Sequence, residues 1–229
     1  MKVVITGTSN GIGLATAQLF IEMGHHVVGI DVESCHKLLL SAVKDGTYEH
    51  YKCDVRHGFE LPCIQDADIL INNAGSQTPE FETDVDDIDV NLKGLINCTE
   101  RYALNNPNIK SVVNLASVSA HNGAEFPRYV ASKGGVISYT VWTAKTLAKF
   151  GATCNSLSFG GVLTNLNSPV INDKKKWDQI MSMTPLKKWT TSEECAEWIY
   201  FVSVVNKSMS GQDIVIDNLE MLNHTFVWD

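Results

Sequence analysis

Several protein classes are excluded by what the sequence lacks. It has no run of 18 apolar residues, so no membrane-spanning helix is predicted, and the apolar run at Val3–Ile5 is too short for a signal peptide. With 18 basic against 26 acidic residues, the net charge of −8 lacks the positive footprint of a nucleic-acid binder. We therefore expect a cytoplasmic protein with neither a nucleic-acid nor a membrane partner.

Metal-binding and disulfide patterns are also missing. The 6 cysteines and 7 histidines are scattered, without a C-x-x-C or H-E-x-x-H motif, so no metal site is predicted and the cysteines are interpreted as reduced thiols. No repeat, low-complexity segment or linker interrupts a chain with 44% hydrophobic and 19% charged residues. A single domain over residues 1–229 is expected.

The chain alternates short apolar runs with longer segments of helical periodicity, which is typical of β-α-β units. This alternation predicts an α/β fold with a single doubly wound, Rossmann-type parallel sheet of about seven strands and helices on both faces. Ligands of such sheets bind at the carboxyl ends of the strands. The predicted strands are 2–6, 26–31, 47–53, 68–72, 109–115, 152–157 and 213–217, and the predicted helices are 12–23, 34–44, 84–104, 127–150, 172–183 and 192–205, with Ser192 as the N-cap of the last.

A glycine-rich turn, T-G-T-S-N-G-I-G, runs from Thr6 to Gly13 between a predicted strand and helix, the context that a dinucleotide-binding turn requires. Gly7 would permit the turn, Gly11 the approach of a pyrophosphate, and Gly13 close helix packing, with helix N–H groups holding the phosphates. The alternative is a turn with packing duties only. The predicted cofactor-binding residues here are Gly7, Ser9, Asn10, Gly11, Ile12 and Gly13.

Asp31 ends the second predicted strand. A carboxylate there can accept hydrogen bonds from an adenosine ribose and would repel a 2′-phosphate, and neither Arg nor Lys occupies positions 8–10 or 32. This favours NAD(H) over NADP(H). The alternative is an exposed aspartate at a strand end.

Candidate catalytic residues gather in the second half. Tyr129 and Lys133 are four residues apart, which places them on one face of a helix, and a nearby cation stabilises a phenolate. That spacing alone would equally fit an exposed helix pair. Ser117 follows the fifth predicted strand, and Asn91 interrupts a helical stretch; alone, they would be a turn residue and a solvated side chain.

Together these motifs resemble the classical short-chain dehydrogenase/reductase family over essentially the whole chain, in order. The resemblance covers the glycine turn, the adenine-contacting Asp54-Val55 pair and the N-N-A-G sequence at 72–75, whose Asn73, Ala74 and Gly75 would contact the cofactor. It also covers the segment after the sixth strand, where Val162 and Thr164 would contact the nicotinamide carboxamide. The catalytic tetrad implied by the resemblance is Asn91, Ser117, Tyr129 and Lys133.

The resemblance implies NAD(P)-dependent interconversion of a secondary alcohol and a ketone. Tyr129 would be the general acid/base, Ser117 would hold the substrate oxygen, and Lys133 would bind the nicotinamide ribose and lower the pKa of Tyr129. Asn91 would hold a water that relays protons toward Lys133. A homodimer or homotetramer is implied as well. A non-catalytic NAD-binding regulator or scaffold is the alternative on the same fold, and an epimerase or dehydratase is a third.

Three departures from the family pattern stand out: Phe159-Gly160 replaces Pro-Gly, Asp217-Asn218-Leu219 replaces Asp-Gly-Gly, and the stretch 75–91 is short, which weakens the case for a particular oligomer. A substrate lid is predicted at about 163–191. Its apolar residues could line a pocket for a hydrophobic carbonyl, such as a 3-oxoacyl thioester, or pack the lid helix onto the sheet. They are Leu166, Val170, Ile171, Trp177, Ile180, Met181, Met183 and Trp189.

Overall fold

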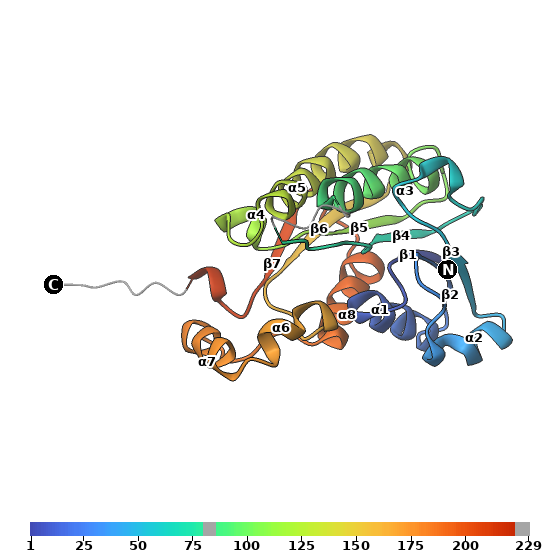
Figure 1. The fold of residues 1–229 in the computed structure, drawn as a ribbon. Coiled ribbons are helices and arrows are strands. Elements are labelled where there is room, and N and C mark those ends of the chain that lie inside the picture. The colour runs from blue at the N-terminus through green and yellow to red at the C-terminus, as the bar shows by residue number, and fades with distance from the viewer. Residues whose placement is uncertain (80–85, 223–229) are drawn as a thin grey trace.

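The computed structural model describes residues 1–79 and 86–222, and its centre is one parallel sheet of seven strands (Figure 1). The strand order is β3-β2-β1-β4-β5-β6-β7, which confirms the predicted doubly wound α/β sheet. The strands are β1 (Lys2–Thr6), β2 (His26–Asp31), β3 (Tyr48–Lys52), β4 (Ile69–Asn72), β5 (Ser111–Leu115), β6 (Thr153–Phe159) and β7 (Asp213–Ile216).

The strand order reverses between β1 and β4, which pair in parallel with Ile5 opposite Ile71. Asn72 lies opposite Asn114, and Leu115 opposite Leu157, so β4, β5 and β6 end at the same edge as β1. In a doubly wound sheet, this reversal opens a crevice beyond the carboxyl ends of the strands. The loops that carry the predicted site residues meet at that crevice.

Helices cover both faces of the sheet (Figure 1). On one face lie α1 (Gly11–Glu22), α2 (Leu40–Lys44) and α8 (Ser192–Tyr200), and on the other lie α3 (Leu95–Tyr102) and α5 (Pro127–Leu147). Strand β1 serves both cores, because Val3 and Ile5 join the first and Val4 joins the second. Burial on both faces explains why the strands read as continuous apolar runs rather than alternating ones.

Short elements complete the chain. They include three helices: α4 (Ser119–Asn122), α6 (Ser168–Ile171) and α7 (Lys174–Met183). Five 3₁₀ turns and two π-helical turns are also present among the described residues. The 3₁₀ turns are Lys37–Leu39, Gly58–Glu60, Ala148–Phe150, Asn165–Asn167 and Glu220–Leu222, and the π-helical turns are Asp89–Gly94 and Phe201–Val205.

Four predicted helix descriptions need correction. The helix expected at 84–104 contains the π-helical turn Asp89–Gly94, and its first two residues lie outside the described residues. The helices expected at 34–44 and 127–150 are partly 3₁₀. The N-cap of α8 is Thr191, not Ser192, because the Thr191 hydroxyl accepts from Glu194 N while the Glu194 carboxylate accepts from Thr191 N. This reciprocal capping box satisfies two N–H groups at the start of the helix.

Within residues 1–79 and 86–222, no helix has the length and apolarity needed to cross a membrane. In that same part of the chain, no three His, Cys, Asp or Glu side chains are grouped as metal ligands. All 6 cysteines are free thiols.

Candidate active site

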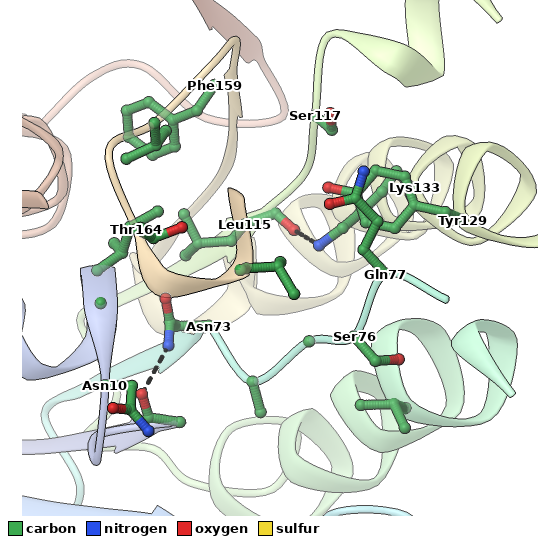
Figure 2. Close-up of a pocket in the computed structure, with 18 of the residues that line it drawn as sticks. Asn10, Asn73, Ser76, Gln77, Leu115, Ser117, Tyr129, Lys133, Phe159 and Thr164 are labelled. Atoms are coloured by element: carbon green, nitrogen blue, oxygen red, sulfur yellow. Dashed lines mark hydrogen bonds between the residues drawn. The ribbon is translucent and has the colours of Figure 1, made fainter. Parts of the chain in front are cut away.

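A cleft of about 820 Å³ opens at the carboxyl edge of the sheet. Segments after all seven strands supply its walls. Figure 2 shows residues that follow β1, β4, β5 and β6. Most of the predicted site residues line it: Gly7, Asn10, Gly11, Ile12, Asp31, Asp54, Val55, Asn73, Ala74, Gly75, Ser117, Tyr129, Lys133, Val162 and Thr164. Ser9, Gly13 and Asn91 do not.

The glycine turn has the backbone that glycine permits. Gly7 and Gly11 have φ angles of +76° and +52°, in the left-handed region that L-residues rarely adopt. A Cβ on Gly13 would lie 2.0 Å from the Gly7 carbonyl oxygen, so Gly13 packs behind the turn and not into the cleft. A Cβ on Gly11 would lie 3.3 Å from a methyl carbon of Thr164, so the segment after β6 closes over the turn.

Residues that follow β4 hold this turn by hydrogen bonds. Asn73 donates from its side-chain amide to the carbonyls of Thr6 (2.9 Å) and Gly7 (3.0 Å). The Thr6 hydroxyl in turn accepts from the backbone N–H groups of Asn73 (3.0 Å) and Ala74 (2.9 Å). Buried carbonyls near a ligand site thus have partners before any ligand is present. The Asn73 side chain braces the turn through these bonds.

Asp31 lies at the end of the cleft nearest β2 and β3. Its carboxylate accepts from the backbone N–H groups of Ser9 (2.8 Å) and Glu33 (2.9 Å). Ser9 is therefore buried as the donor that orients Asp31, which explains why it does not face the cleft. At the same end, the Asp54 carboxylate pairs with the Arg56 guanidinium at 2.7 Å, and these hydrogen bonds hold the pKa of Asp54 below its usual range.

Lys133 is buried at the opposite end, where its amine donates to the carbonyl of Leu115 at 2.8 Å (Figure 2). Burial lowers the pKa of Lys133 to about 8, while the negative charges of Asp87 and Glu125 act in the opposite direction. The amine lies 5.6 Å from the centre of the Tyr129 ring. The predicted pair is thus brought together on α5.

Tyr129 is buried beside Lys133. Burial raises the pKa of Tyr129 well above its usual range, the charge of Glu125 raises it further, and the hydrogen bond with Ser117 lowers it. The phenol is therefore neutral in this structure. That Lys133 lowers the pKa of Tyr129 stays a prediction.

Ser117 follows β5 and is held by its neighbour. Its hydroxyl oxygen accepts from the Ser119 hydroxyl at 2.6 Å and from Ser119 N at 3.2 Å. Ser117 also forms a hydrogen bond with Tyr129, which lowers the pKa of the phenol.

Asn91 braces a loop behind the cleft. Its side-chain oxygen accepts from Ser76 N at 2.7 Å, and its amide donates to the Ser76 carbonyl at 2.9 Å and to the Ser132 hydroxyl at 3.0 Å. All three bonds are to protein groups, and Asn91 is 1% exposed, so it does not line the cleft as expected. It lies within the π-helical turn Asp89–Gly94, a local irregularity frequent at functional sites.

The chain was compared with known proteins. A family model described as enoyl-(acyl carrier protein) reductase matches residues 7–218. A curated relative, the 3-oxoacyl-(acyl-carrier-protein) reductase FabG of Staphylococcus epidermidis, is 30% identical, over 93% of this chain and 96% of the relative. The chain belongs to the short-chain dehydrogenase/reductase family. The prediction of an oxidoreductase of this family is confirmed.

Solved structures of short-chain dehydrogenases/reductases are similar over nearly their whole length. A protein assigned as a 2-deoxy-D-gluconate 3-dehydrogenase from Agrobacterium tumefaciens, with bound NADP, superposes with a TM-score of 0.86 at 28% identity, covering 96% of both chains. A 4-hydroxyisoleucine dehydrogenase mutant complexed with NADH and succinate gives a TM-score of 0.82 at 28% identity, covering 96% of this chain and 98% of the other. The two neighbours thus carry different forms of the nicotinamide cofactor.

The lid segment meets neither expectation fully. Helices α6 and α7 have no buried residue, so they are not packed onto the sheet as core. Leu166 and Trp189 line the cleft, and Trp177 packs edge-on against Trp189 with ring centres 5.2 Å apart. The lid therefore contributes a small apolar wall through these three residues.

The altered sequence after β7 adopts the backbone of the residues it replaces. Asn218 and Leu219, which stand where the family pattern has two glycines, have φ angles of +52° and +69°. The Asp217 carboxylate stabilises the turn by accepting from Leu219 N (3.0 Å) and Met221 N (2.8 Å). A branched residue in the left-handed region is strained, and such strain is typical of functional segments. This turn carries Glu220 into the cleft.

Sequence reasoning missed three polar residues of the cleft, namely Gln77, Glu125 and Glu220. Glu125 had a signal, because it stands four residues before Tyr129. Glu220 had none, since only the folded turn after β7 brings it near Gly161. A third acid, Asp87, is 1% exposed and accepts from the hydroxyls of Ser76 (2.7 Å) and Thr78 (3.0 Å).

Proposed function

We propose that the protein is an NAD(H)-dependent oxidoreductase that interconverts a secondary alcohol and a ketone. One observation carries the proposal: Ser117, Tyr129 and Lys133 meet at one end of a cleft whose other end holds the glycine turn and Asp31. A cofactor site and an acid/base site that share one cleft are what hydride transfer to a substrate oxygen-bearing carbon requires.

The cleft fits a dinucleotide. The left-handed glycines leave a cradle without side chains at the start of α1, where N–H groups favour a pyrophosphate. Residues Asp31, Asp54 and Val55 would hold the adenosine end, and Val162 and Thr164 the nicotinamide end. When bound, the cofactor supplies or accepts the hydride.

The protein's own part is proton transfer and orientation. A neutral Tyr129 phenol can donate a proton to a ketone oxygen, and Ser117 can hold that oxygen by a hydrogen bond. Lys133 would bind the nicotinamide ribose. Asn91 acts through the Ser76 backbone as a positioning residue.

We further propose a preference for NAD(H). The Asp31 carboxylate, oriented by Ser9 N and Glu33 N, would accept from a ribose hydroxyl and repel a 2′-phosphate. The solved neighbours carry NADP in one case and NADH in another, so the preference depends on Asp31 in this chain.

Fluorescence titration with NADH and with NADPH, followed by turnover assays of Tyr129→Phe, tests the proposal. We expect the wild-type protein to bind NADH more tightly than NADPH. The Tyr129→Phe variant should keep the NADH affinity of the wild type, while its turnover falls by about 10²–10⁴-fold. Equal turnover in both proteins would remove Tyr129 as the acid/base. NADH binding with no turnover of any carbonyl or alcohol would favour the second candidate, a non-catalytic NAD-binding regulator, which the strained and altered turn after β7 favours.

The remaining expectations are proposals of the same kind. A homodimer or homotetramer is supported by exposed apolar side chains on α5 and along α8 and the following turn: Trp142, Trp198, Phe201 and Val205. The free cysteines agree with a reducing, cytoplasmic location. We also propose one domain over residues 1–229 with a lid at about 163–191. Light scattering of the purified protein measures the oligomeric state.

A further inference from the structure

Two acidic side chains, Glu125 and Glu220, line the Ser117–Tyr129 end of the cleft. Glu125 precedes α5, and Glu220 begins the 3₁₀ turn after β7. Burial raises the pKa of each carboxyl. Neither has a part in the acid/base scheme, and keeping both carboxyls in one partly apolar pocket costs free energy.

The Glu220 side of this pocket has unused hydrogen-bonding groups. Glu220 Oε2 accepts from Gly161 N at 3.1 Å, but Oε1 is buried without a hydrogen-bond partner. Trp189 is 8% exposed, and its Nε1 also has no partner of suitable geometry, although its proximity lowers the pKa of Glu220. This acceptor and this donor therefore stand together in one wall without a hydrogen bond of standard geometry, and buried polar groups in that state are rare in proteins.

Positive charge is scarce at this end. Among the described residues that line the cleft, the cations are Lys133 and Arg56, and Arg56 lies at the far end, paired with Asp54. Lys133 is engaged by the Leu115 carbonyl. An anionic substrate would thus meet two carboxyls with no free cation to offset them, and a phosphate-bearing acyl thioester would meet no Arg cluster.

We propose that Glu125 and Glu220 select a neutral, hydroxyl-rich substrate, a polyol or sugar, whose O–H groups donate to the two carboxyls beside the reacting carbon. The inference rests on the proposed oxidoreductase function and replaces the 3-oxoacyl thioester expected from the apolar lid. Hydroxyls can also accept from Trp189 Nε1, which an ammonium group cannot do.

The test compares matched probes at fixed cofactor: xylitol, D-sorbitol and D-glucose as neutral polyols, and D-gluconate as the acid counterpart of glucose, each with NAD⁺. Acetoacetyl-CoA, assayed with NADH, is the probe for an acyl thioester substrate. The variants are Glu220→Gln and Glu125→Gln, which keep shape and remove charge. Glu197→Gln, exposed on α8 and outside the cleft, is the matched control. NADH affinity and circular dichroism of each variant report folding.

We expect at least one neutral polyol to be oxidised with a kcat/KM about tenfold or more above that of D-gluconate, and acetoacetyl-CoA to be reduced poorly. Each Gln variant should lower kcat/KM for the polyol about tenfold, which is the size expected for hydrogen bonds to a charged acceptor. The ratio of kcat/KM for the polyol to kcat/KM for D-gluconate should fall as well. The control variant should change neither value.

Three results would overturn the inference while NADH binding and the Tyr129 dependence persist. They are faster turnover of D-gluconate or acetoacetyl-CoA, no turnover of any neutral polyol, and an unchanged polyol-to-gluconate ratio in both Gln variants. The last result would mean that Glu220 only braces Gly161 and Trp189. Loss of NADH binding in the wild-type protein, by contrast, would count against the proposed function itself.

Discussion

The two ends of the cleft are built in different ways. At the glycine turn, Asn73, Thr6, Ser9 and Asp31 pair their polar groups with one another before any ligand binds. At the wall formed by Trp189 and Glu220, a donor and an acceptor remain unpaired, and Leu219 holds a strained backbone. The cofactor end is thus preorganised around one shape, while the substrate end keeps free groups that a ligand must complete.

Gly13→Ala should break the preorganised end. The new Cβ would lie 2.0 Å from the Gly7 carbonyl oxygen, so the turn must move. Overpacking of this kind costs about 1–3 kcal/mol, and we expect NADH affinity to fall by roughly 100-fold as the cradle distorts. Chemical denaturation and NADH titration measure the two effects.

Gly134→Ala is the matched control. A Cβ on Gly134 meets no atom within 4 Å, and the residue lies within α5. Alanine there should raise the free energy of unfolding by up to about 1 kcal/mol and leave NADH affinity unchanged. Equal losses in both variants would mean that the turn is not the sensitive element.

Asp31→Asn sharpens the comparison at the adenosine end. The amide keeps the shape and one acceptor oxygen but removes the charge that would repel a 2′-phosphate. The preference for NADH over NADPH should fall about tenfold, mostly through tighter NADPH binding. If both affinities fall together, Asp31 supports the turn rather than selecting the cofactor.

A pH titration tests the acid/base end. Since the pKa of Lys133 is lowered to about 8, its amine is charged below that pH and neutral above it. Binding of the cofactor to a charged lysine should therefore weaken a few-fold as the pH rises from 7 to 9. Lys133→Met should bind weakly with no such dependence; a wild-type protein with a flat profile would contradict the assignment.

Leu219→Gly is expected to have the smallest effect. Its φ of +69° strains a branched side chain by roughly 1–2 kcal/mol, which glycine relieves, although the unfolded chain gains entropy with glycine. The net result should be a thermal midpoint raised by a few degrees or less. A clear loss of stability would show that the half-exposed Leu219 side chain has a packing role.

The sheet could be predicted because its strands are buried on both faces and therefore appear as apolar runs such as Val3-Val4-Ile5. The glycine turn could be predicted because the positive φ of Gly7 and the close packing of Gly13 both require glycine. The role of Asn91 in holding a water stays a prediction, and its three hydrogen bonds to Ser76 and Ser132 could not be predicted because they depend on tertiary packing. The burial of Tyr129 and the charge of Glu125, which both raise the pKa of the phenol, could not be predicted because both depend on tertiary packing. Glu220 could not be found, since its approach to Gly161 spans 59 positions of the chain.

The place of β1 constrains how this chain can fold. Although β1 precedes the other six strands of the sheet in the sequence, it lies in the interior of the sheet between β2 and β4. Its residues Val3 and Val4 therefore keep one unpaired edge until Ile69 and Leu70 are available. Parallel pairing over such separations makes folding slow and leaves intermediates prone to association. Nascent chains that end before β4 should consequently be the ones that most need chaperone protection during translation.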